Sequence, residues 1–169
     1  MRPDVVQIGL QAALFPVEGS SALRPEWRLL LCLHTRIGLP GYILLQPHGM
    51  QYGTLLSFSV SAVRDPNNVP GAVRVEQLSF PVQRKDRGIR WPTAEELVSL
   101  LVNRRMHRAP AERRPEEDYF HWALFALHML SKAEWLMPYA DMVAAVQRES
   151  VEAQLSAISL SGETGTTES

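Results

Sequence analysis

This sequence has a single cysteine, Cys32, which excludes disulfides within one chain and metal sites built on several thiolates. It also lacks any run approaching the roughly 20 apolar residues that span a membrane, so we expect no membrane partner. Between Met1 and Leu14, the polar residues Asp4 and Gln7 interrupt the apolar ones, unlike in a signal peptide. These absences predict a cytoplasmic protein.

The short motifs of nucleotide, nucleophile-elbow and zinc-protease sites are missing too. There is no GxSxG, no HExxH, no Walker loop and no GxGxxG that opens a helix. His121 and His128 are seven residues apart, about 10 Å along one helix, so they cannot chelate one metal ion together. We therefore expect no metal and no other cofactor, and any catalysis would be cofactor-free.

The formal net charge is only −1, which gives no global bias toward nucleic acid, but the positive charges are unevenly spread. Nine of the seventeen Lys and Arg residues fall between Arg84 and Arg114. Acidic residues interrupt this basic segment, and neither an aromatic ladder nor a phosphate loop accompanies it. We expect a solvated basic surface and no nucleic-acid partner; the alternative is a contact surface for a partner of another kind.

The length and composition predict one globular domain. With 169 residues, 46% hydrophobic and 21% charged, the chain can bury a core of ordinary size. We expect a single domain over residues 1–158. A polar tail rich in Gly, Ser and Thr follows at 159–169, and we expect it to be disordered.

The pattern of apolar residues predicts an α+β fold, with a mostly antiparallel sheet in the N-terminal half. Between residues 27 and 37 both faces are mostly apolar, as in a central strand, and Pro40-Gly41 indicates a hairpin to the next strand. Residues 54–63 alternate, as in an outer strand. The five expected strands lie at 4–14, 27–37, 42–45, 54–63 and 73–82.

Three helices are expected in the C-terminal half. Thr93 and Glu96 form a capping-box pattern before the first helix, and a mobile loop is expected at 107–117. The second helix begins near 116–118 and is apolar nearly all round to Leu130, so we expect it to be central and buried. The third follows Pro138, and the residues expected to face inward are Met142, Val143, Val146 and Leu155.

Candidate chemistry rests on a few polar and aromatic residues. His121, near the start of the second helix, is either a hydrogen-bonded core histidine or a general acid or base beside a pocket. Cys32 and His34 share one strand face about 7 Å apart, which permits a thiolate–imidazole pair, although a cysteine among leucines more often packs as a small hydrophobe. Large aromatic residues such as Trp27 and Trp122 serve either as core or as pocket walls.

The stretches 26–30 (Glu-Trp-Arg-Leu-Leu) and 118–122 (Asp-Tyr-Phe-His-Trp), with the helix at 95–102, resemble a family of small fungal domains over roughly residues 5–130. The family's layout is similar to a permuted papain arrangement, which implies thiol chemistry. This chain has Glu26 where the family has histidine and Tyr119 near the position of the cysteine. The resemblance therefore implies a retained pocket without the thiol chemistry, and accessory cyclases or isomerases of natural-product pathways are its closest functional analogy.

These observations lead to three hypotheses. The first is a cofactor-independent cyclase or isomerase, for example a Diels–Alder-type pericyclase, acting on an apolar small molecule. Its catalytic residues would be His121, Glu26 and Tyr119, and Trp27, His34 and Trp122 would bind the substrate. The second is a non-catalytic interaction protein that uses the basic segment 84–114. The third is a degenerate thiol hydrolase using Cys32 and His34. The sequence does not indicate an oligomeric state.

Overall fold

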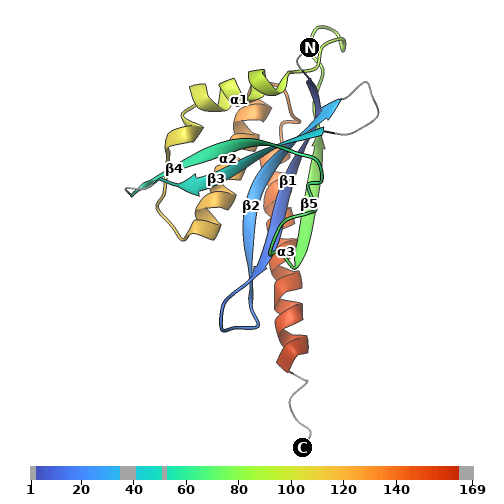
Figure 1. Ribbon diagram of the computed structural model, residues 1–169. Coiled ribbons are helices and arrows are strands. Elements are labelled where there is room, and N and C mark those ends of the chain that lie inside the picture. The colour runs from blue at the N-terminus through green and yellow to red at the C-terminus, as the bar shows by residue number, and fades with distance from the viewer. Residues whose placement is uncertain (1–2, 35–40, 51–52, 164–169) are drawn as a thin grey trace, which may run out of the picture.

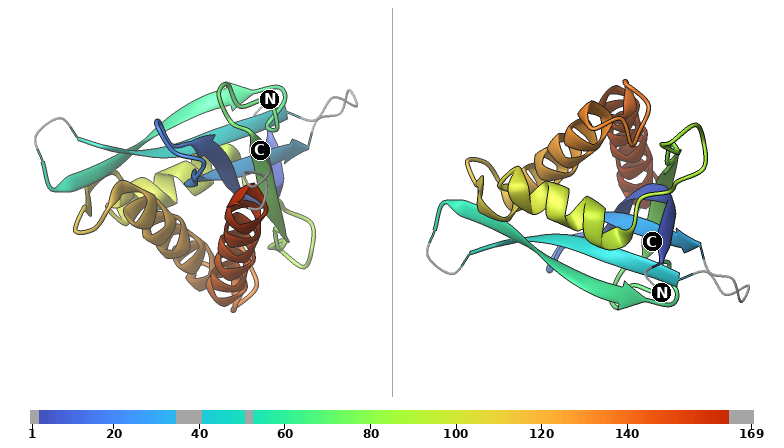
Figure 2. Two further views of the ribbon diagram at one scale, coloured as in Figure 1. Left: turned by 90° about the horizontal axis from the view of Figure 1, so that it is seen from below. Right: turned by 90° about the horizontal axis from the view of Figure 1, so that it is seen from above.

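The computed structural model describes residues 3–34, 41–50 and 53–163 and has an α+β fold, as the sequence predicts. A twisted antiparallel sheet carries all three α-helices on one of its faces (Figures 1 and 2). The order of its strands is β5-β1-β2-β3-β4-β6. Within the described residues, no helix is both long and apolar enough to cross a membrane.

All five predicted strands are present. Their bounds are β1 Asp4–Pro16, β2 Leu23–His34, β3 Gly41–Gly49, β4 Leu55–Val63 and β5 Arg74–Pro81. A sixth strand, β6 Ala109–Pro110, is only two residues long and pairs with Leu55 and Leu56 of β4. It lies inside the segment 107–117, for which the sequence predicts a mobile loop, and the short 3-10 helix η1, Met106–Arg108, overlaps the start of that segment.

The hairpin of β2 and β3 is confirmed, with Leu29 opposite Leu45. Part of the predicted turn before β3 lies outside the described residues. The sequence predicts β2 as the central strand, and the structure adds β1, which pairs with β2 on one side and β5 on the other. One face of these two strands packs against the helices, and on the other face the connection between β4 and β5 contacts Gln11 and Arg28, which accounts for their long runs of buried residues.

The helices cover the sheet face formed by alternate residues such as Ile8, Trp27 and Leu29. Helix α1, Ala94–Asn103, begins with the predicted capping box, in which Thr93 Oγ1 accepts from Glu96 N–H and the Glu96 carboxylate accepts from Thr93 N–H. Helix α2, Pro115–Lys132, packs on β2 and against α1 and α3, and so occupies the predicted central position.

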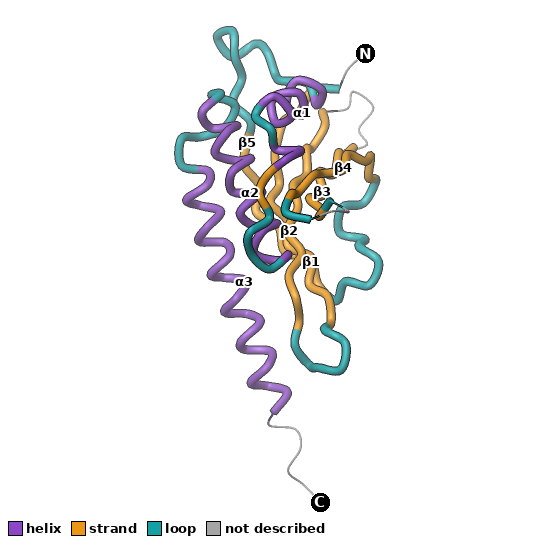
Figure 3. The backbone as a smooth tube through the Cα atoms, turned by 90° about the vertical axis from the view of Figure 1, so that its left-hand side faces the viewer, coloured by secondary structure: helices purple, strands orange, loops and turns teal. Residues whose placement is uncertain are grey.

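Helix α3, Ala140–Glu163, follows Pro138 as predicted but turns a different face to the core. Ala140, Ala144 and Val151 are buried, whereas Met142 and Val146 are 63% and 64% exposed. The prediction that Met142, Val143 and Val146 face inward is wrong, and that for Leu155 is confirmed. The helix projects past the end of the sheet (Figure 3) and includes the first five residues of the predicted tail; residues 164–169 lie outside the described residues.

Candidate functional site

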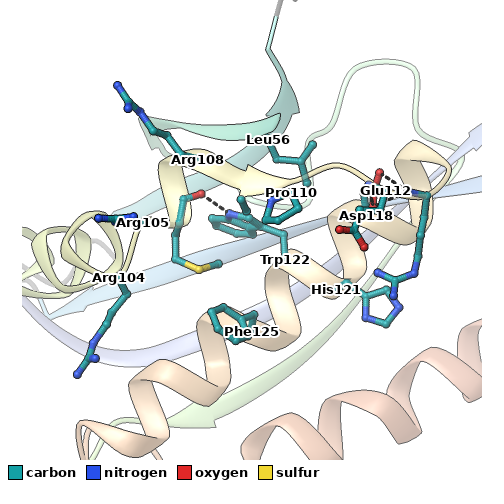
Figure 4. Close-up of a pocket in the computed structure, with 13 residues that line it drawn as sticks. Leu56, Arg104, Arg105, Arg108, Pro110, Glu112, Asp118, His121, Trp122 and Phe125 are labelled. Atoms are coloured by element: carbon teal, nitrogen blue, oxygen red, sulfur yellow. Dashed lines mark hydrogen bonds between the residues drawn. The ribbon is translucent and has the colours of Figure 1, made fainter. Parts of the chain in front are cut away.

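A cleft of about 470 Å³ lies between the segment 104–113 and one face of α2. Leu56 of β4, η1 and β6 form one wall, and Asp118, His121, Trp122 and Phe125 of α2 form the other. Figure 4 shows Arg104, Arg105 and Arg108 at one end of this cleft and Glu112, Asp118 and His121 at the other, with Trp122 between them. The cleft therefore combines an apolar middle with two differently charged ends.

The floor of the cleft is rigid. Trp122 is buried, its Nε1 donates a hydrogen bond of 2.9 Å to the backbone oxygen of Met106, and its ring lies 5.3 Å from that of Phe58. This bond fixes η1 against α2. Phe125, one turn further along α2, is 50% exposed and adds an accessible aromatic surface next to the buried tryptophan.

Backbone contacts hold the segment 104–113 in place. Arg105 has a left-handed backbone, with φ of 61°, which turns the chain from α1 into η1. Ala111 N–H donates to Thr54 oxygen at 2.7 Å, extending the β4–β6 pairing. The buried carboxylate of Asp118 accepts from the backbone N–H groups of Glu112 and Arg113 at 3.1–3.2 Å. The loop predicted to be mobile is thus tied to both the sheet and α2.

Arginines dominate the charge of the cleft. Arg104, Arg105, Arg108 and Arg113, which we call the rim arginines, line it together with only two carboxylates, Glu112 and Asp118. Within the described part of the chain, no rim arginine has an ion pair or a hydrogen bond from its side chain. The carboxylate of Asp118 is already occupied by backbone donors. The cleft therefore presents an excess of free positive charge.

In the rest of the predicted basic segment, three cations have partners. Arg84 stacks over the ring of Trp91 and Lys85 over that of Trp135. Arg90 forms ion pairs of 2.7 Å with Glu96 and 3.2 Å with Asp86. The structure thus divides the segment 84–114 into a self-paired part near Arg90 and an unpaired part around the cleft.

His121 is the titratable side chain of the cleft whose protonation its surroundings change. Its pKa is held below the ordinary value, chiefly by desolvation and then by the positive charges of Arg113 and Arg148, while Glu117 and Asp118 act in the opposite direction. His121 is consequently neutral near pH 7 and can accept a proton or a hydrogen bond.

The structure brings only two of the six predicted site residues, His121 and Trp122, to the cleft. Trp27 is buried in the core, with its ring 4.8 Å from that of Phe120, and Tyr119 is half-buried against the same core. Glu26 lies on the opposite face of the sheet, where its carboxylate accepts from Gln46 Nε2 at 3.0 Å. His34 is exposed at the end of β2, opposite Asp4.

Comparisons with known protein families, with curated proteins and with solved structures found no match. The function of this chain has to be inferred from its own geometry.

Cys32 and the possible metal ligands of the described residues were the other candidates for chemistry. Cys32 is half-buried, and burial raises the pKa of its thiol, which disfavours the reactive thiolate. Among the described residues, no three His, Cys, Asp or Glu side chains are grouped so that they could hold a metal ion.

The sequence reasoning missed that the rim arginines, Met106 and Phe125 belong with His121 and Trp122. One signal was available: Asp118, His121, Trp122 and Phe125 have the spacing i, i+3, i+4, i+7, which places them on one face of a helix. No local signal indicates that Met106 and the rim arginines fold back onto that face, since this depends on the two-residue pairing of β6 with β4.

Proposed function

We propose that this protein is a non-catalytic interaction protein that binds an acidic segment of a partner protein in the cleft. The observation that carries this proposal is the group of Arg104, Arg105 and Arg108, which have no ion-pair partner in the described chain and line the same cleft as the exposed ring of Phe125. Acidic residues of a partner would meet the arginines, and an apolar residue would cover the aromatic surface.

The spacing of the charges favours a peptide over a small anion. In Figure 4 the side chains of Arg104 and Arg108 point in different directions rather than toward one point. A small anion is best held by donors that converge on it, as in a bidentate arginine clamp. Cations spread along a cleft instead match several acidic side chains on an extended chain, and burial of an aromatic or aliphatic residue supplies the apolar contact.

The test is binding of a fluorescent peptide in which glutamates flank a Leu-Phe pair, measured by anisotropy at low salt. The double variant Arg104→Glu/Arg108→Glu should lower the affinity about ten-fold, because two attractive contacts become repulsive. The matched control is Arg24→Glu/Arg64→Glu, which makes the same change in net charge at exposed arginines away from the cleft and should leave the affinity nearly unchanged.

The aromatic part of the cleft has its own control. Phe125→Ala should weaken binding of the Leu-Phe peptide but not of a peptide with glutamates alone.

The proposal would be overturned if Arg24→Glu/Arg64→Glu lost as much affinity as Arg104→Glu/Arg108→Glu, because the loss would then follow from net charge alone. The protein could also bind a single-stranded DNA oligonucleotide more tightly than the peptide and lose this binding in the Arg104/Arg108 variant. That result would identify nucleic acid, and not an acidic peptide, as the ligand of the cleft.

The second candidate is the cofactor-free cyclase or isomerase predicted from the sequence, and the presence of His121 and Trp122 in one cleft favours it. In this candidate, Trp122 and Phe125 contact an apolar substrate and neutral His121 accepts a proton. Conversion of a neutral apolar substrate that is slowed by His121→Ala, but not by Arg104→Ala, would support it. Glu26→Ala should have no effect on such a reaction, because Glu26 lies on the other face of the sheet.

A further inference from the structure

The sheet has a second cavity on the face opposite the helices. There, the connection between β4 and β5 crosses over β1 and β2, and Figure 3 shows the helices on the other side of the sheet. A cavity of about 210 Å³ lies beneath this connection. The sheet contributes Arg28, Leu30 and Leu44 to its walls, and the connection contributes Asp65, Asn68 and Val69.

Arg28 is an unusual wall residue, because it is a cation only 9% exposed that has no ion pair within the described residues. Its Nε donates to Gln11 Oε1 at 2.5 Å and its Nη2 contacts the backbone oxygen of Pro66 at 3.4 Å. Nη1 has no hydrogen-bond partner in the described chain. A buried guanidinium without an ion-pair contact is costly, and burial accordingly lowers the pKa of Arg28, while the more distant negative charge of Glu26 acts in the opposite direction.

The surroundings hold this side chain firmly. Gln11 is fully buried, and its Nε2 donates to the same Pro66 oxygen at 2.9 Å. The Arg28–Gln11 pair thus fastens the connection to the sheet and fixes the direction of the guanidinium. Arg28 lines the cavity, and its Nη1, which has no partner in the described chain, is available to an occupant.

We infer that this cavity binds a small aliphatic carboxylate, held by the free donors of Arg28 and packed against Leu30, Leu44 and Val69. A planar guanidinium matches the two oxygens of a carboxylate, and the apolar walls match a short hydrocarbon chain. The volume is below the range for drug-sized ligands, which limits the occupant to a short chain. The carboxylate of Asp65, held by Asn67 N–H at 3.0 Å, adds a negative charge that selects a monoanion over a dianion such as phosphate.

The experiment is a thermal unfolding series of the full chain with sodium butyrate, compared with sodium chloride and sodium phosphate at equal ionic strength. Butyrate should raise the Tm at millimolar concentrations, and the rise should become logarithmic in butyrate concentration above Kd, since a ligand of the folded state stabilises it in proportion to ln(1 + [L]/Kd). Chloride and phosphate should give smaller rises at the same ionic strength. A butyrate effect no larger than that of chloride would overturn the inference.

Two variants locate the site, and neither removes Arg28, whose loss would endanger folding. Val69→Trp fills the cavity from the connection and should abolish the butyrate effect. Asp65→Asn removes a repulsive charge and should tighten butyrate binding a few-fold. The inference would fail if Val69→Trp kept the full rise of Tm with butyrate. It would also fail if Asp65→Asn lowered the Tm and left butyrate binding unchanged, because this result would identify Asp65 as the counter-ion of Arg28. Arg104→Glu/Arg108→Glu should not alter the butyrate effect, so this site is tested independently of the cleft.

Discussion

Trp122 and Phe125 are three residues apart on α2, yet one is buried and the other is half exposed. Both belong to an apolar stretch whose periodicity predicts a buried helix on several sides. Their exposure differs because their surroundings differ. Met106 and Phe58 cover Trp122, whereas Phe125 faces the open cleft. The exposure of an aromatic residue on a helix thus depends on tertiary contacts that its own helix does not encode.

His121 should make binding of an acidic peptide depend on pH. Desolvation and nearby arginines hold its pKa below the ordinary value for histidine, and a bound carboxylate favours the imidazolium, so binding takes up a proton. The affinity should therefore rise as the pH falls from about 7.5 to about 5.5, by at most about five-fold for one exposed charge pair. Fluorescence anisotropy at constant ionic strength measures this, and the glutamates of the peptide stay mostly ionised in that range.

The control separates His121 from an exposed histidine outside the cleft. His121→Gln keeps a polar side chain but cannot become charged, so its affinity should be nearly independent of pH over the same range. His48→Gln removes an exposed histidine on β3, outside the cleft, and should preserve the dependence. A dependence that survived in His121→Gln would assign the proton to another group.

The start of helix α1 can be predicted from its sequence, but the buried face of helix α3 cannot. The capping box of α1 is local, because Thr93 and Glu96 bond to each other's backbone within one turn. The bond from Thr93 N–H is also the main cause of the lowered pKa of Glu96. The orientation of α3 is not local. It has large apolar residues on one side and small ones on the other, and the small ones, Ala140 and Ala144, are buried.

Substitutions on α3 should confirm which side packs. Ala144→Leu adds volume where α3 meets the core and should lower the free energy of unfolding by about 1–3 kcal/mol. Val146→Lys replaces an exposed apolar residue and should change it by less than about 0.5 kcal/mol. Urea denaturation measures both. A larger loss for Val146→Lys than for Ala144→Leu would contradict the structure and indicate that Val146 faces the core, as the sequence predicts.

For the whole molecule, the pattern of apolar residues together with turn and capping signals predicts five strands, three helices and their α+β arrangement. Alternation within a strand also limited the site: neighbours in a strand face opposite sides of the sheet, so Glu26 and Trp27 could not line one pocket on one face. The cleft and the Arg28 cavity could not be predicted in this way. Each forms where a connection, 104–113 or 64–73, folds back onto the sheet through backbone contacts that leave no periodic pattern.

Trp27 joins the layers of the molecule, and its removal should destabilise the whole fold. The centre of its ring lies 4.8 Å from that of Phe120 on α2. The guanidinium of Arg148 on α3 lies over the Phe120 ring, 4.8 Å from its centre. The sheet, α2 and α3 thus meet in one continuous contact. Trp27→Ala should lower the free energy of unfolding by about 3–5 kcal/mol in urea denaturation, because it leaves a cavity at this junction.

Glu26→Ala is the neighbouring control, since its side chain leaves the other face of β2 and loses one hydrogen bond, to Gln46. It should cost only about 1 kcal/mol. If Trp27 were instead a wall of a substrate pocket, Trp27→Ala would remove ligand contacts and leave the fold nearly as stable as before. A large stability loss for Trp27→Ala, beside a small one for Glu26→Ala, assigns Trp27 to the core that supports the cleft rather than to the cleft itself.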